Sequence, residues 1–273
     1  MTRRNMTQVV AAGIAAGAAE LLAQTAPKTQ THDMGPLKVT MSEKPVEIAM
    51  LIYSGMTALD LIGPQQVFGY LMGTKVHLVA KTQEPVVSDT GVTIVPSKTF
   101  DSCPDPVDVL FVPGGGMGTI KLMTDAAVLD FLQKKAATAQ YVTSVCTGSL
   151  VLGAAGLLRG YKATSHWAVR EVLPLLGAEP VNVRVVEDRN RITAAGVTAG
   201  IDFALRVGAR LNGEDMGRGV ELMIEYDPHP PFESGTPEKA GPRIGGAGKM
   251  FYAPLVAAAR TSAEAAAKGW PKA

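Results

Sequence analysis

The chain has 273 residues, a length that allows one or two domains. Apolar residues make up 47% of it and charged residues 19%, which excludes a wholly disordered protein because such chains combine low hydrophobicity with high net charge. The 26 basic and 25 acidic residues nearly cancel, so we expect no nucleic acid as a partner. Two cysteines are too few for a disulfide scaffold, and no apolar run is long enough to span a membrane.

Residues 1–44 are set apart as a leader and linker. Arg3 and Arg4 precede a weakly apolar stretch of small residues, which is typical of an export signal. The start resembles a twin-arginine leader, although Thr7 and Gln8 depart from the usual pattern. We therefore expect export to the periplasm; the alternative is a cytoplasmic protein that keeps this segment.

Short apolar runs alternate with helical patterns from residue 45 to residue 227. Strands are expected at 46–53, 76–80, 92–95, 107–112, 141–145, 163–165, 181–186 and 191–194. Helices are expected at 64–71, 120–137, 149–158, 169–176, 199–211 and 215–226. This alternation predicts one domain, a three-layer α/β/α sandwich with a mainly parallel sheet.

Residues 228–273 are predicted to form a tail and a helix outside that domain. Five prolines between 228 and 242 predict an extended tail of about twenty residues. The alanine-rich segment 250–268 predicts a helix that packs on the rim of the sheet or on a neighbour.

Cys146 falls at a junction between a predicted strand and a predicted helix that begins near Gly148. This layout is that of a nucleophile elbow, where a sharp turn exposes the side chain at the end of the sheet. The start of a helix would favour a thiolate there, and the alternative is a buried structural cysteine. Cys103 lies in a loop rich in aspartate and proline, and we expect a spectator thiol.

Two other strand ends carry unusual residues. The glycine loop 113–118 fails as a dinucleotide fingerprint because Thr119 stands where the third glycine is needed. It fits close approach of the backbone to a small ligand, or only a tight turn. Asp60 sits in the turn before the first helix, where it either faces the elbow or caps the helix.

Histidine offers one candidate partner for the cysteine. His166 follows Cys146 by twenty residues, and a Cys–His pair would indicate hydrolysis by an activated thiol. His32, His77 and His229 lie in the leader, a strand and the tail. No cluster has the spacing of metal ligands, so we expect no metal.

Five stretches resemble the ThiJ/PfpI superfamily of class I glutamine amidotransferase-like proteins, and within it the isonitrile hydratases. They are 59–64, 112–115, 141–158, 163–167 and 198–203. The cysteine segment is the most specific of them. The run 194–196 departs from the pattern, because a richer glycine content is usual there.

The resemblance implies a role for each site residue. Cys146 would be the nucleophile, Asp60 the acid and base, and Thr147 a residue that positions the cysteine. Backbone N–H groups of Gly115 and Thr147 would face the substrate, and His166 is predicted to bind it. The implied reaction converts an isonitrile to an N-substituted formamide through a covalent thioimidate, with no cofactor.

Other members of the superfamily supply the competing interpretations. A histidine after the cysteine, or a glutamate in place of Asp60, is usual in peptidases and glyoxalases, so Thr147 and Asp60 speak against both. A ligand-sensing domain of a transcription regulator would need a longer C-terminal reader, and a thiol sensor would need Cys146 but not Asp60. The resemblance also implies a homodimer, to which the apolar positions 251, 255 and 256 would contribute.

Overall fold

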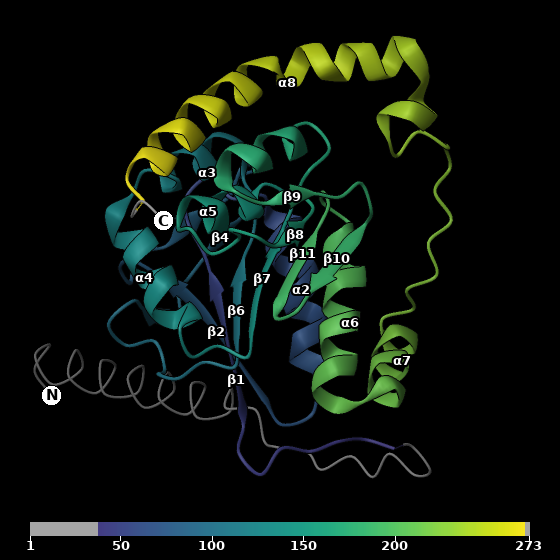
Figure 1. Cartoon of the computed structure of the whole chain (residues 1–273). Helices are drawn as coiled ribbons and strands as arrows, with labels where there is room; N and C mark the ends of the chain where they lie inside the picture. Colours follow the sequence, from purple (N-terminus) through teal and green to yellow (C-terminus); the bar gives the residue numbers. More distant parts are fainter. Residues whose placement is uncertain (1–37, 271–273) are drawn as a thin grey trace, which may run out of the picture. The chain divides into compact units, whose positions relative to one another are not determined.

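The computed structural model describes residues 38–270 (Figure 1). The expected twin-arginine leader lies outside these residues. A seven-stranded sheet has the order β10-β11-β7-β6-β1-β2-β5, and all neighbours are parallel except the β10–β11 hairpin. Its strands are β1 (Val46–Leu51), β2 (Thr74–Ala80), β5 (Lys98–Thr99), β6 (Val109–Val112), β7 (Tyr141–Val145), β10 (Val185–Asp188) and β11 (Arg191–Ala194). Two small ladders join β3 (Val86–Val87) to β4 (Thr93–Ile94) and β8 (Lys162–Ala163) to β9 (Glu179–Pro180).

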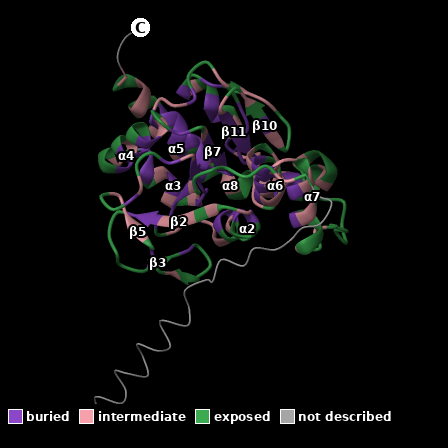
Figure 2. Ribbon diagram, turned by 90° about the horizontal axis from the view of Figure 1, so that it is seen from below, coloured by how far each residue is buried: buried purple, intermediate pink, exposed green. Residues whose placement is uncertain are grey.

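Helices pack on both faces of this sheet. One layer consists of α2 (Ala58–Tyr70), α6 (Ala199–Asn212) and α7 (Glu214–Met223). The other consists of α3 (Gly116–Leu122), α4 (Ala126–Ala136), α5 (Gly148–Ala154) and the 3-10 helix η1 (Arg170–Leu176). The predicted three-layer α/β/α sandwich is confirmed, and Figure 2 shows its buried residues concentrated on central strands such as β7. No helix within residues 38–270 is long and apolar enough to cross a membrane.

The core fixes the central strands of the sheet between the two helical layers. Strands β1, β6 and β7 are almost entirely buried, as expected for strands covered on both faces. Phe111 of β6 lies 6.4 Å from Phe68 of α2 and 5.7 Å from Phe203 of α6, measured between ring centroids. Each such buried ring contributes about 1.5–3 kcal/mol, so β6 is held firmly between the two helices.

Two predicted helix boundaries are wrong. Helix α2 begins at Ala58 rather than near Pro64, and Asp60 therefore lies in its first turn. Burial of Leu61 and Phe68 against the core offsets the roughly 3 kcal/mol that an internal proline costs. The helix predicted over 120–137 is two helices, because Asp125 starts α4 by accepting the Val128 N–H at 3.3 Å.

The C-terminal segment is also more helical than predicted. Helix α8 (Pro237–Lys268) begins well before residue 250, because Thr236 accepts the Lys239 N–H and Pro237 occupies the first turn. Gly241 kinks it with φ 73°. In Figure 1 it runs across the end of the sheet where the strands terminate, and it contacts η1, α5 and α3. Leu255 is buried within its own chain, whereas Phe251 is 77% exposed.

Candidate active site

Cys146 occupies the elbow that the sequence predicts. It lies between β7 and α5 with φ 57°, in the left-handed region that a side chain adopts only where the surroundings enforce it. Its N–H donates to the Ala194 carbonyl at 3.0 Å, and its own carbonyl accepts the Ser165 hydroxyl at 3.0 Å. A Cβ on Gly148 would lie 2.3 Å from the Val112 carbonyl oxygen, so only glycine allows the turn to pass so close to β6.

Asp60 lies beside the cysteine and is fully buried. The Gly114 N–H donates to its Oδ2 at 3.0 Å, while Oδ1 has no hydrogen-bond partner in the part of the chain that the structure describes. A Cβ on Gly114 would lie 2.7 Å from both Asp60 Oδ2 and Thr147 Oγ1. The first glycine of the loop therefore makes room for the carboxyl group and the threonine to meet near the thiol.

Burial governs the protonation of this pair. It raises the pKa of Asp60 to about 7, although hydrogen bonds from the Cys146 thiol and the Gly114 N–H partly oppose the rise. Burial, followed by the Asp60 charge, also raises the pKa of Cys146 well above its usual value, and the Thr147 N–H lowers it less. The N–H at the helix start favours the thiolate as expected, but burial and the Asp60 charge raise the pKa of the thiol by more. Burial thus favours the neutral form of both groups over the charged form.

The backbone N–H of Gly115 does not face the cavity as the resemblance implied. The Gly115 N–H donates to Thr147 Oγ1 at 3.0 Å, so this N–H is committed to the protein rather than to a substrate. Gly115 still lines the cavity, and a Cβ there would lie 2.5 Å from the Gly55 carbonyl oxygen. Hydrogen bonding by the Thr147 N–H lowers the pKa of Cys146.

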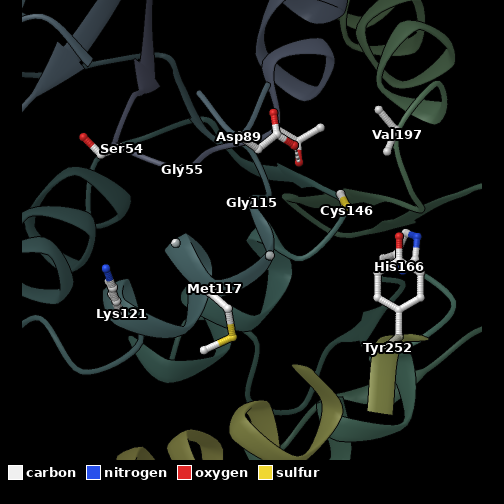
Figure 3. Close-up of a pocket in the computed structure, with 13 residues that line it drawn as sticks. Ser54, Gly55, Asp89, Gly115, Met117, Lys121, Cys146, His166, Val197 and Tyr252 are labelled. Carbon is white, nitrogen blue, oxygen red and sulfur yellow. Dashed lines mark hydrogen bonds between the residues drawn. The ribbon is translucent and has the colours of Figure 1, made fainter. Parts of the chain in front are cut away.

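A cavity of about 490 Å³ opens over the cysteine. In Figure 3, His166, Tyr252 and Val197 lie on the side of Cys146, whereas Lys121 lies across the cavity from them. One wall is thus largely apolar and aromatic, and the other carries a charge at the rim. Such a cavity suits a small organic molecule with one apolar group.

His166 forms part of this wall as a neutral ring. Burial lowers its pKa to about 4, and its Nδ1 accepts the Ala168 N–H at 3.3 Å, which places the remaining proton on Nε2. A Cβ on Gly196 would lie 2.2 Å from the His166 Cδ2. The run 194–196 therefore keeps its glycine at the position where the imidazole needs the space.

Tyr252 is a site residue that sequence reasoning missed. It comes from α8, and its ring lies 5.0 Å from that of His166 and 5.3 Å from that of Trp167. No motif surrounds it, and the position of α8 follows from tertiary packing rather than from spacing. The only signal was the amphipathic pattern of the alanine-rich segment.

The second cysteine and the other histidines lie away from the cavity over Cys146. Cys103 is buried in the loop before β6, where burial raises its pKa, and both cysteines are free. His77 pairs with Glu47 at the far side of the sheet, and His229 is exposed in the tail. Among residues 38–270, no group of three or more His, Cys, Asp and Glu side chains is placed to hold a metal ion.

These features define a class of protein: an α/β/α sandwich with a cysteine at a nucleophile elbow and a buried carboxylic acid beside it. Residues 46–209 match the DJ-1/PfpI family, and the chain belongs to this family. It is 52% identical over 195 residues to the isonitrile hydratase of Pseudomonas putida, a match that covers 71% of this chain and 85% of that protein. The resemblance drawn from the sequence is thereby confirmed.

Two further relatives resemble the chain, one at a similar sequence identity and one at a lower identity. The crystal structure of a THiJ/PfpI family protein from Pseudomonas syringae has a TM-score of 0.83 and 49% identity, and the match covers 87% of this chain and 98% of that one. The HTH-type transcriptional regulator GbdR of Pseudomonas aeruginosa is 30% identical over 197 residues, which is 68% of this chain but 52% of the regulator. The domain thus occurs both in an enzyme and in a longer regulator.

Proposed function

We propose that the protein is a cysteine-dependent hydratase that converts isonitriles to N-substituted formamides. The observation that carries this proposal is the fully buried carboxyl group of Asp60 beside Cys146, whose own side chain lines the cavity. The 52% identity to an isonitrile hydratase supports the same reaction class.

The first half of the reaction forms a carbon–sulfur bond. The terminal carbon of an isonitrile accepts a soft nucleophile, and the Cys146 sulfur attacks it as the thiol proton passes to the Asp60 carboxylate. Asp60 then delivers that proton to the same carbon. The product is a thioimidate, R–N=CH–S–Cys146. A carboxyl group with a pKa near 7 suits both transfers, because it accepts and releases a proton at neutral pH.

The second half adds water to the same carbon. Asp60 takes a proton from water, the hydroxyl group adds to the thioimidate carbon, and the nitrogen receives the proton. When the carbon–sulfur bond breaks, the hydroxyl proton returns through Asp60 to the sulfur. One isonitrile and one water give one formamide, R–NH–CHO, and the thiol is restored.

The experiment is to incubate the purified protein with cyclohexyl isocyanide in H₂¹⁸O. We expect N-cyclohexylformamide that carries one ¹⁸O atom, detected by mass spectrometry, and none with Cys146→Ala. Formamide formed equally by both proteins, or by neither, would contradict the proposal.

The similarity to the regulator GbdR supports a second candidate, a thiol or ligand sensor without catalysis. Asp60 separates the two, because a sensor needs only Cys146. In a sensor, Asp60→Asn would leave ligand binding and oxidation of Cys146 in place; in the enzyme, the same change removes turnover. The buried carboxyl group beside the thiol favours the enzyme, because burial raises its pKa to about 7, where it can both accept and release a proton.

We also propose export by a twin-arginine route, which the pattern at Arg3 and Arg4 supports. Fusing residues 1–35 to a reporter that must fold before export tests it, and replacing both arginines with lysine should stop export. Unchanged export would contradict it.

A homodimer is proposed as well, with the exposed Phe251 of α8 near its rim. Light scattering at micromolar concentration should give twice the mass of the chain. A monomer there would contradict it.

A further inference from the structure

The cavity over Cys146 has two chemically different sides. Beside the thiol lie His166, Val197 and Tyr252, and the ring centroids of His166 and Tyr252 are 5.0 Å apart (Figure 3). Lys121 lies across the cavity from them. The volume of about 490 Å³ falls within the range of pockets that bind drug-sized molecules. The cavity therefore has room for an isonitrile that carries more than a simple alkyl group.

Lys121 brings a positive charge to this cavity that the protein itself does not use. Of the described residues that line the cavity, Lys121 is the only cation, because His166 is neutral. It lies in the last turn of α3 and is exposed. None of the ion pairs among residues 38–270 includes it, whereas Lys81 pairs with Asp125. The ammonium group of Lys121 is thus available to an anionic group of a ligand.

The anion that lines the same cavity is already engaged by the protein. Asp89 accepts the Thr57 hydroxyl at 2.9 Å on Oδ2 and the Ala58 N–H at 3.2 Å on Oδ1, so it caps the start of α2. The partial positive charge at the start of a helix offsets part of the carboxylate charge. The cavity therefore offers a free positive charge rather than a free negative one.

We propose that the preferred substrate is an isonitrile with a carboxylate on the carbon next to the nitrogen, which is the isonitrile of an α-amino acid. Such a carbon branches three ways, as the cavity does. The isonitrile group reaches Cys146, and the amino-acid side chain packs on Val197 and Tyr252. The carboxylate then lies on the side of Lys121. This inference rests on the proposed function, because it names the substrate class of the same site.

The first test compares 2-isocyano-3-phenylpropanoate with its neutral methyl ester. In Lys121→Met the ratio of the two kcat/KM values, carboxylate over ester, should fall about fivefold, which is the upper range for a partly exposed ion pair. Lys121→Arg keeps the charge and should keep the ratio near that of the wild type. Raising the salt concentration should lower the ratio in the wild type but not in Lys121→Met, because salt screens the charge.

A matched control separates this site from the net charge of the protein. Lys134 is exposed on α4 and does not line the cavity. Lys134→Met removes one positive charge, as Lys121→Met does, and should leave the ratio unchanged.

The second test needs no turnover. Hydration of this isonitrile would give N-formylphenylalanine, which should protect Cys146 from alkylation by iodoacetamide in a Cys103→Ala background. Peptide mass spectrometry measures the protection. We expect half-protection at about fivefold lower concentration than with N-formylphenylalanine methyl ester, and Lys121→Met should remove this difference.

The outcomes distinguish the inference from the proposed function. If the protein hydrates cyclohexyl isocyanide but Lys121→Met leaves the kinetic ratio unchanged, or Lys134→Met lowers it equally, the inference is overturned and the hydratase stands. If the protein hydrates no isonitrile but N-formylphenylalanine protects Cys146 through Lys121, the anion site stands and the hydratase does not. Equal protection by the acid and its ester in the wild type would overturn the inference in either case.

Discussion

The two cysteines are both buried and free, yet they differ in backbone conformation, in the charged group beside them and in access to the cavity. Cys146 has φ 57° at an elbow, a buried carboxyl group beside it and a cavity above it. Cys103 lies in a loop, where its own carbonyl oxygen accepts from Lys135 at 3.4 Å and its thiol lines no part of the cavity over Cys146.

Burial alone therefore does not distinguish a nucleophile from a spectator thiol. It raises the pKa of both groups. Beside Cys146 lies the fully buried carboxyl group of Asp60, whereas the charge that acts most strongly on Cys103 is the ammonium group of Lys135, which lowers the pKa of that thiol. The proposed reaction therefore depends on a proton acceptor beside the thiol rather than on an unusually acidic thiol.

Removing each thiol is the change with the largest expected contrast. Cys146→Ala should abolish formamide production, because no other group forms the carbon–sulfur bond. Cys103→Ala should keep kcat within about twofold, since Cys103 does not reach the cavity. Steady-state kinetics of both variants measure this, and an inactive Cys103→Ala with an active Cys146→Ala would reverse the assignment.

Removing the acid is the next largest effect. Asp60→Asn should lower kcat by about 10²–10⁴-fold, the usual contribution of a general acid and base. In the wild type, kcat/KM should fall as the pH drops below about 7, because Asp60 becomes protonated and no longer accepts the thiol proton. Asp101→Asn, at an exposed position near Cys103, serves as the control. A flat profile between pH 5 and pH 8 would exclude Asp60 as the base.

The same buried carboxyl group should make stability depend on pH. The pKa of Asp60 is about 7 in the folded chain against 3.8 when unfolded, so the folded state holds the proton more tightly and the wild type loses stability as the pH rises between these values. Asp60→Asn should remove this loss and gain about 4 kcal/mol relative to wild type above pH 7, but little at pH 4.

Urea unfolding at pH 4, 6 and 8 measures this difference. Asp101→Asn should change the free energy of unfolding by less than about 0.5 kcal/mol at each pH. A gain for Asp60→Asn that is the same at pH 4 and pH 8 would show that the charge is not buried.

Displacing His166 should give the smallest effect. Gly196→Ala places a Cβ where the imidazole lies, so kcat/KM should fall about tenfold as the ring shifts in the cavity. Gly246→Ala, where α8 leaves open space around the glycine, should leave kcat/KM unchanged. Equal kinetics for the two variants would remove His166 from the substrate wall.

The elbow was predictable because its determinants are contiguous in the sequence: a strand, a cysteine and a glycine-led helix. Asp60 was harder, since spacing left it either facing the elbow or capping a helix, and the resemblance alone favoured the first. The start of α2 was predicted wrongly because Pro64 obeys a local rule that core packing overrides. Tyr252 could not be predicted, because its place at the site depends on how α8 docks on distant elements.

The most direct test of the central claim is to trap the covalent intermediate. Wild-type protein is mixed with cyclohexyl isocyanide, quenched with acid within milliseconds to seconds, digested and examined by mass spectrometry. We expect the mass of one isonitrile on the peptide that contains Cys146, none on the peptide that contains Cys103, and decay of the adduct as formamide appears. Formamide production without any adduct on Cys146 at all quench times, or with the adduct on Cys103, would contradict it.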